Sequence, residues 1–365
     1  MRELAVGQLL IIGFDGTAMS QRLASLLAKI QPAGVILFAR NIKGAAQTHS
    51  LLRECQKCVA TPLFTCVDLE GGTVDRFRNV LGPAPSPADV FATRRRALFR
   101  KHGRVIGENC RALGFNVDFA PVLDLALAPS RRVMSSRAVS GDPKQVAIYA
   151  HEFLRGLRDA RVLGCGKHFP GLGEASLDTQ AEQPSISKPW KRLWKEDLLP
   201  YRKLRHNLPF VMVAHAAYPQ VTGDNAPASL SKKWMNGILR KKIGYRGLII
   251  TDDLDMGGVL ATMPIDDAAV ETLRCGADLF LICQKEESVR RAFEAVLKRA
   301  ESDKKFAGLI AEKSKRVHDA KKKSKALKHM APPPKQKTVE RLTRKIWQFS
   351  EEVRAYSMPA DEVDG

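Results

Sequence analysis

Apolar residues recur along the chain in short runs, and the segments between these runs have helical spacing. Eight runs are rich in Val, Ile, Leu and Phe, which predicts strands that are buried on both faces. They lie at residues 9–14, 34–38, 63–67, 117–125, 162–165, 210–214, 248–251 and 279–283. In the segment 145–157 the apolar residues stand three or four positions apart, which predicts an amphipathic helix.

The alternation of strands and helices predicts an α/β protein built as a (β/α)8 TIM-type barrel. Such a barrel needs about 250 residues, and the chain has 365. The competing fold, a doubly wound open sheet, lacks a G-x-G-x-x-G motif after the first strand. We expect the barrel to occupy residues 1–305 as a single domain, and residues 306–365 to form a basic, helical or irregular C-terminal extension.

Polar residues stand within or directly after several apolar runs. The carboxyl ends of all strands in a parallel barrel meet at one face, where active sites form. Polar clusters in similar positions therefore predict one shared site, although each cluster alone also fits a helix cap or a buried polar residue. The clusters are Asp68 with Glu70, Asp118 with Asp124, Lys167 with His168, His215, and Asp252 with Asp253.

The chain carries 59 Lys and Arg against 39 Asp and Glu, a net charge of +20. Such an excess raises nucleic acid or an anionic membrane as a partner. Half of it lies in residues 301–345, with 15 basic and 5 acidic residues, and an amphipathic helix is expected over residues 338–354. Nucleic-acid binding by residues 313–345 is an alternative function, but these residues lack interleaved aromatic side chains and a recognised binding fold.

Cysteine usage and apolar run length predict the compartment. The seven cysteines are odd in number and scattered, which is typical of reduced thiols in a cytoplasmic protein. The N-terminal run is a poor signal peptide, and no run reaches the roughly 18 apolar residues of a membrane span. Cys55 and Cys58 lack a second pair and a nearby His, and the eight His residues show no HxH or HxxxH spacing. We therefore expect a cytoplasmic protein without a membrane contact or a metal site.

Six stretches form an ordered set of motifs over roughly residues 5 to 290. They read VDLEGGTVDR (67–76), GFNVDFAPVLD (114–124), SR (136–137) with GDP (141–143), KHFPG (167–171), MVAH (212–215) with PASLS (227–231), and GLIITDDLDM (247–256). With these motifs the chain resembles family 3 glycoside hydrolases, in particular the single-domain bacterial β-N-acetylglucosaminidases of peptidoglycan recycling. The resemblance implies a retaining exo-acting enzyme that cleaves O-glycosidic bonds of small, cell-wall-derived saccharides containing N-acetylglucosamine. It also implies no cofactor, and we expect a monomer or a weak homodimer.

The resemblance places the catalytic nucleophile at Asp252. A carboxylate in this role attacks the anomeric carbon and forms a covalent glycosyl-enzyme, which water then hydrolyses with net retention. The alternative for Asp252 is a helix cap, a duty for which Asp253 is the better candidate.

The sugar-binding positions of the family correspond to Asp68, Arg76, Arg137, Lys167 and His168. Charged donors and acceptors of this kind bind vicinal hydroxyls of a pyranose through charge-assisted hydrogen bonds. The alternatives are a structural ion pair between Arg76 and Asp68 and a satisfied core histidine at 168. Glu70 precedes two glycines and is expected to shape the loop.

One departure from the family concerns the acid/base. In the branch resembled, a His on the loop after KHFPG does this work, oriented by an Asp two residues before it, so Asp178 matches the orienting residue. The loop here reads GLGEASLDTQ (171–180), so the His position is Gln180. An amide cannot exchange a proton near neutral pH, whereas a His can.

Three outcomes follow from Gln180. Glu174 or Glu182 substitutes as the acid/base, or the enzyme is slow and acts on substrates with good leaving groups. In the third outcome the barrel binds sugar or a partner without hydrolysis. Thr73, where the family often has Arg, and Asp75, where it often has Gln, predict different hydrogen bonding near Asp68.

Overall fold

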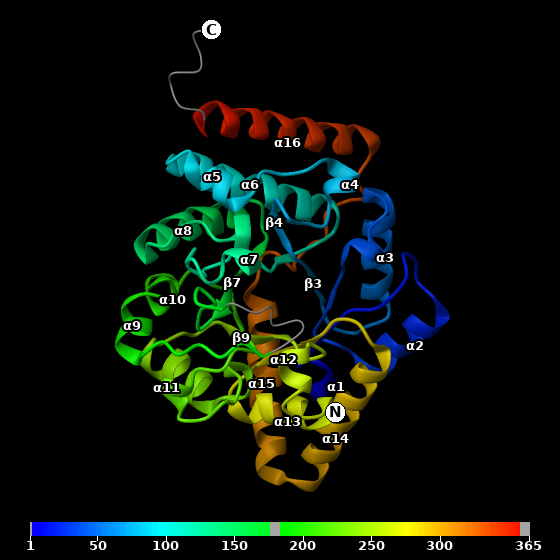
Figure 1. The fold of residues 1–365 in the computed structure, drawn as a ribbon. Helices are drawn as coiled ribbons and strands as arrows, with labels where there is room; N and C mark the ends of the chain where they lie inside the picture. The colour runs from blue at the N-terminus through cyan, green and yellow to red at the C-terminus, as the bar shows by residue number, and fades with distance from the viewer. Residues whose placement is uncertain (1, 176–182, 358–365) are drawn as a thin grey trace.

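Eight parallel strands close into a barrel that is surrounded by helices (Figure 1). The computed structural model describes residues 2–175 and 183–357. Around the barrel the strands follow the order β1-β10-β9-β8-β7-β6-β3-β2, and β1 pairs in parallel with both β10 and β2. The predicted (β/α)8 architecture is confirmed.

Each barrel strand coincides with one of the apolar runs, and almost every strand residue is buried. The strands are β1 (Leu10–Ile12), β2 (Gly34–Ile36), β3 (Phe64–Val67), β6 (Val117–Asp118), β7 (Leu163–Phe169), β8 (Phe210–Val213), β9 (Leu248–Asp253) and β10 (Leu279–Ile282). The strand β6 is shorter than the predicted 117–125. Beyond it the chain contains Pro121, which has no N–H for a ladder, and only isolated bonds such as Leu123 N–H to the Lys167 carbonyl (2.6 Å) continue the pairing.

The helices cover the outside of the barrel. The longer ones are α2 (Gln21–Ile30), α3 (Ala45–Lys57), α6 (Arg96–Ala112), α8 (Pro143–Asp159), α10 (Leu198–Leu204), the π-helix η4 (Lys233–Lys242), α13 (Ile265–Cys275), α14 (Glu286–Ser302), α15 (Lys304–Lys323) and α16 (Gln336–Ser357). Short ones are α1 (Arg2–Gly7), η1 (Ala39–Asn41), α4 (Arg78–Leu81), α5 (Pro87–Ala92), α7 (Arg131–Met134), η2 (Ser135–Arg137), α9 (Trp190–Lys195), α11 (Pro219–Thr222), η3 (Ala228–Leu230) and α12 (Gly257–Leu260). The amphipathic segments predicted at 145–157 and 338–354 lie inside α8 and α16. None of the described helices is long and apolar enough to cross a membrane.

A small hairpin follows β3 and carries the 67–76 motif. It consists of β4 (Leu69–Gly71) and β5 (Val74–Asp75). Gly71 has φ +88°, and a Cβ there would lie 2.2 Å from the Pro85 carbonyl oxygen, so only glycine fits. The buried carboxylate of Asp75 accepts hydrogen bonds from the N–H groups of Phe77 (3.0 Å) and Ala84 (2.9 Å), which fixes the end of the hairpin.

The basic region after residue 303 forms the helices α15 and α16, which pack against other helices of the protein. The helix α15 contacts α1, α13, α14 and β9, and two of its lysines are buried. Lys313 donates to the Ala277 carbonyl (2.6 Å), and Lys321 donates to Gln8 Oε1 (2.8 Å). Other cations here are paired with acids on the surface, including Lys315 with Asp319 (2.8 Å). Some of the basic side chains of this region therefore make contacts within the fold.

Lys321 provides a test of the packing of α15. Burial lowers the pKa of its ammonium from 10.5 to about 7. The folded state thus binds fewer protons than the unfolded state between pH 7 and 10, so the destabilisation by this group fades as pH rises. We expect Lys321→Met to raise the free energy of unfolding by about 2–4 kcal/mol at pH 7 and by much less at pH 10.

Urea unfolding at several pH values between 7 and 10 measures this difference. The matched control is Lys322→Met, because Lys322 is exposed on the same helix. A gain in stability that is the same at pH 7 and pH 10 would contradict the assignment of the effect to the buried amine.

Candidate active site

A cavity of about 460 Å³ opens at the carboxyl ends of the barrel strands. Its walls come from the ends of β2, β3, β7, β8, β9 and β10, from the hairpin β4–β5 and from η2. All six predicted nucleophile and sugar-binding side chains line it, although they are far apart in sequence: Asp68, Arg76, Arg137, Lys167, His168 and Asp252.

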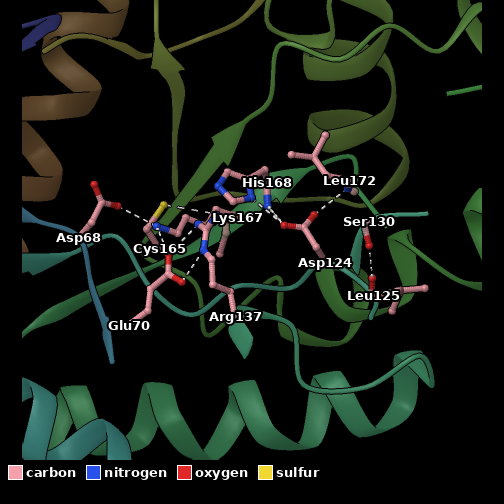
Figure 2. Close-up of polar contacts among 12 residues, drawn as sticks. Asp68, Glu70, Asp124, Leu125, Ser130, Arg137, Cys165, Lys167, His168 and Leu172 are labelled. Atoms are coloured by element: carbon pink, nitrogen blue, oxygen red, sulfur yellow. Dashed lines mark hydrogen bonds and ion pairs between the residues drawn. The ribbon is translucent and has the colours of Figure 1, made fainter. Parts of the chain in front are cut away.

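Lys167 and Glu70 form the centre of an ion-pair cluster on one wall of this cavity (Figure 2). The Lys167 Nζ lies 2.7 Å from Asp68 Oδ1 and 2.7 Å from Glu70 Oε1. Arg137 donates two hydrogen bonds to the same Glu70 carboxylate, from Nε and Nη2, each 2.8 Å long. Two cations and two carboxylates thus hold one another in place, and the cluster as a whole is neutral.

Burial and pairing act in opposite directions on the groups in this cluster. Burial raises the pKa of the Glu70 carboxyl, but the charges of Lys167 and Arg137 outweigh burial and hold its pKa well below the usual value. Burial lowers the pKa of Lys167, and Asp68 with Glu70 more than reverses this, so its pKa is raised. Both groups are therefore charged at neutral pH.

His168 and Asp124 form a second pair beside the cluster (Figure 2). The Asp124 Oδ2 lies 2.6 Å from His168 Nδ1 and also accepts the His168 backbone N–H (3.2 Å). Its Oδ1 accepts the N–H of Leu172 (2.7 Å), at the start of the following loop. Asp124 thus orients the imidazole of His168, a residue that lines the cavity and is 7% exposed.

The two carboxylates at the end of β9 have different surroundings. Asp253 Oδ1 accepts the backbone N–H of Asp255 (3.0 Å) and of Cys283 (3.1 Å), so Asp253 ties β9 to β10. Burial, with the neighbouring charge of Asp252 as a smaller contribution, raises the pKa of Asp253 to about 7. Asp252 is only half-buried and lines the cavity, and its Oδ1 accepts the Asp253 N–H (2.9 Å).

His215 stabilises the end of β9 through hydrogen bonds. It is fully buried and lies outside the cavity lining. Its Nδ1 lies 2.7 Å from Ser229 Oγ, and its Nε2 lies 2.9 Å from the Asp253 carbonyl oxygen. Burial lowers the pKa of His215, so the ring is neutral and holds the backbone next to Asp252 by hydrogen bonding.

Arg76 also lines the cavity, and its guanidinium lies 5.7 Å from the centre of the Phe38 ring. Within the described residues it forms no ion pair, and its buried Nε has no hydrogen-bond partner. The alternative of a structural pair between Arg76 and Asp68 is therefore not what the structure shows, because Asp68 pairs with Lys167. The Arg76 cation faces the cavity.

The family model for the N-terminal domain of glycosyl hydrolase family 3 matches residues 1–320 of this chain. The chain belongs to glycosyl hydrolase family 3. This confirms the resemblance inferred from the six motifs, and residues from five of those motifs line the cavity just described.

Relatives of this family 3 chain include proteins named beta-hexosaminidase. The one from Thioalkalivibrio sulfidiphilus is 35% identical over 293 residues, covering 78% of this chain and 83% of the relative. The one from Idiomarina loihiensis is 32% identical over 298 residues, covering 80% and 89%. Among solved structures, a family 3 beta-N-acetylglucosaminidase from Paenibacillus sp. has a TM-score of 0.90 at 30% identity, covering 96% of this chain and 68% of that chain.

The loop after KHFPG contains the candidates for the catalytic acid/base. Asp178, Gln180 and Glu182 lie outside the described residues. Glu174 is described and does not line the cavity. Its Oε1 lies 3.3 Å from Arg192 Nη2 and 3.6 Å from the buried Lys188 Nζ, so Glu174 is part of an ion-pair cluster beside α9.

Two residues of the site have contacts that the sequence interpretation did not predict. Glu70 was expected to shape the loop, but it bridges Lys167 and Arg137. Asp124 was noted only as one of several polar residues after apolar runs, but it orients His168. Their position after buried runs was the available signal, while their partners come from other strands and were not visible in the pattern.

A metal site would require several His, Cys, Asp or Glu side chains close together. In residues 2–175 and 183–357, no group of three or more His, Cys, Asp or Glu side chains is placed to hold a metal ion. Two of the carboxylates at the cavity wall, Asp68 and Glu70, are instead paired with Lys167 and Arg137.

Proposed function

We propose that this family 3 protein is a retaining exo-β-N-acetylhexosaminidase that cleaves O-glycosidic bonds of N-acetylhexosamine sugars. The main support for this proposal is that Asp252 lies in the same cavity as the Lys167–Glu70–Arg137 cluster. The relatives named beta-hexosaminidase and the Paenibacillus beta-N-acetylglucosaminidase support the choice of sugar.

In this proposal Asp252 is the nucleophile. Its carboxylate attacks the anomeric carbon as the bond to the leaving oxygen breaks, and water later displaces the carboxylate with net retention. Two observations support Asp252 and not Asp253 as the nucleophile. Asp252 lines the cavity, whereas Asp253 Oδ1 accepts backbone hydrogen bonds that tie β9 to β10. The reaction requires no cofactor.

The sugar-binding roles are assigned to the wall of the cavity. Asp68, Lys167 and His168 are preorganised by their partners and present charged or polar atoms to sugar hydroxyls. Arg137 is held by Glu70, whereas Arg76 forms no ion pair with the described residues and can meet a substrate oxygen.

For the acid/base we propose a carboxyl group from residues 176–182, where Asp178 and Glu182 are the candidates. The ion pairs of Glu174 and its place outside the cavity lining argue against Glu174. A carboxylic acid matches the general chemistry of retaining glycosidases, which protonate the leaving oxygen and then activate water with one such group.

Substitution of the three acids tests this assignment. Glu174→Gln is expected to change kcat by no more than about threefold, because Glu174 pairs with Lys188 and Arg192 and does not line the cavity. Loss of the true acid/base should lower kcat about 10²-fold or more on a natural disaccharide. Comparison of Glu174→Gln, Asp178→Asn and Glu182→Gln on that disaccharide and on an aryl glycoside separates them. An equally large loss in Glu174→Gln on both substrates would contradict the proposal.

The activity itself is tested with an aryl β-N-acetylglucosaminide. Wild type should hydrolyse it, and the first sugar product seen by NMR should be the β-anomer. The competing function is a silent sugar-binding barrel. Inactive wild type together with a Gln180→His variant whose activity depends on Asp252 would establish that competing function.

We further propose a cytoplasmic role in recycling cell-wall sugars, with residues 1–305 as the catalytic barrel and residues 306–365 as an added extension. The resemblance to recycling enzymes supports the role. Burial of Lys313 and Lys321 and the surface pairing of Lys315 argue against a polyanion as the partner of the extension. Accumulation of N-acetylglucosamine-containing muropeptides in the cytoplasm of a deletion strain would test the role.

A further inference from the structure

The helix α16 lies across the three helices that surround the β4–β5 hairpin. It packs against α4, α5 and α6 at one end of the molecule (Figure 1). The family match ends at residue 320, so α16 lies beyond it. The face of α16 that meets these helices buries four apolar side chains: Leu342, Ile346, Phe349 and Val353.

Among these four residues, Phe349 packs against His102 of α6. It is fully buried, and its ring centre lies 5.7 Å from that of His102. His102 is also fully buried; it meets Phe153 of α8 edge-on at 5.2 Å and bonds Tyr149 Oη through Nδ1 at 2.8 Å. Burial lowers the pKa of His102 to about 3, so the ring is neutral and this packing holds at any pH near neutrality.

The far edge of His102 meets the hairpin next to Glu70. A Cβ on Gly71 would lie 3.2 Å from His102 Nε2, so the ring abuts the hairpin backbone at the residue after Glu70. Among the described residues Nε2 has no hydrogen-bond partner, so His102 supports the hairpin by packing. The path from α16 to Glu70 is thus continuous: Phe349, His102, Gly71.

A second path from α16 leads to the other end of the Glu70 ion pair. The helix α5, on which α16 also packs, contacts η2, and η2 ends at Arg137. Gly72 fits between these elements, because a Cβ there would lie 2.5 Å from Ser86 Cβ and 3.4 Å from Ser136 Oγ. Both partners of the bidentate bond between Arg137 and Glu70 are therefore backed by α16.

We propose that α16 is a positioning element of the active site, with Phe349 and His102 as positioning residues that hold the hairpin so that Glu70 fixes Lys167 and Arg137. This inference rests on the proposed function for its effect on catalysis. Loosening the hairpin lets the sugar-binding cations spread over more orientations, which weakens ground-state and transition-state binding alike. Uniform loss of this kind raises KM and leaves kcat nearly unchanged.

The test compares Phe349→Ala with Trp347→Ala in the full chain. Trp347 is an aromatic residue of the same helix that is 61% exposed, so it is the matched control. With an aryl β-N-acetylglucosaminide, Phe349→Ala should raise KM about tenfold with kcat within about twofold, and Trp347→Ala should change neither. Phe349→Leu, which refills most of the space, should return KM most of the way to the wild-type value.

A second measurement does not need turnover. Amide hydrogen exchange of residues 69–75 should become about tenfold faster in Phe349→Ala and stay unchanged in Trp347→Ala. Unchanged exchange in the hairpin, or a fall in kcat at constant KM, would overturn the proposal, because the second pattern reports only a smaller folded fraction. If Phe349→Ala does not fold, the same two readouts on Phe349→Leu decide, with smaller shifts expected. Wild-type protein without hydrolysis would defeat the proposed function, while the exchange data would still decide whether α16 braces the hairpin.

Discussion

Replacement of Asp252 by Asn is expected to lower kcat for an aryl β-N-acetylglucosaminide on the order of 10⁴-fold. The amide keeps the size of the side chain and its hydrogen bond from the Asp253 N–H, but it cannot form the covalent glycosyl-enzyme. Binding of N-acetylglucosamine should persist, because the cluster around Lys167 is untouched. Steady-state kinetics and calorimetric titration of the sugar measure the two effects separately.

Two further variants make this test specific. Asp266→Asn removes an exposed carboxylate that pairs with Arg291 on the surface, and it should leave kcat unchanged. Asp252→Gly with added azide should regain turnover, since azide forms a C–N bond at the anomeric carbon from the vacated side as the bond to the aryl oxygen breaks. The product is then the α-glycosyl azide. Hydrolysis by Asp252→Asn at close to the wild-type rate would remove Asp252 from the role of nucleophile.

The second large effect is expected for Glu70→Gln. The neutral amide cannot balance the buried Lys167 and the half-buried Arg137, so Arg137 loses its bidentate carboxylate and Lys167 keeps only Asp68. Removal of one partner from a buried ion pair costs about 3–5 kcal/mol, and the remaining pair with Asp68 places the expected loss near 3 kcal/mol. Because we propose that the same cations bind the sugar, kcat/KM should fall about 10²-fold.

Urea unfolding at neutral pH measures the stability loss, with the exposed Glu287 as the site of a matched Glu287→Gln control expected within about 0.5 kcal/mol of wild type. The pH dependence has a definite sign. A carboxyl whose pKa is lowered on folding stabilises the fold at pH above its ordinary value of 4.5, and this contribution is lost as pH falls through the folded pKa. Wild type should therefore lose stability below pH 4.5 more steeply than Glu70→Gln. Equal stability of the two proteins at neutral pH would show that the cluster does not depend on Glu70.

Of the acid/base candidates Glu174, Asp178 and Glu182, only Glu174 lies among the described residues. The replacement of His by Gln180 is visible only as a departure from the motif. Glu174 was an obvious substitute in sequence, because it lies in the same loop segment. The structure places it against Lys188 and Arg192, residues that follow the loop, so its charge is already used. Distance along the chain could not reveal that pairing.

The sequence by itself determined the barrel and the face that bears the site. Apolar runs at strand spacing bury both faces of parallel strands, and parallel strands end at one rim, so the polar residues after 67, 166 and 251 had to meet there. Only the tertiary structure decided which of them touch. Lys167 pairs with Asp68, 99 residues away, and with Glu70, and α16 packs against the distant helices α4, α5 and α6. Such pairings depend on side-chain directions and on packing between distant elements, which a pattern along one chain does not contain.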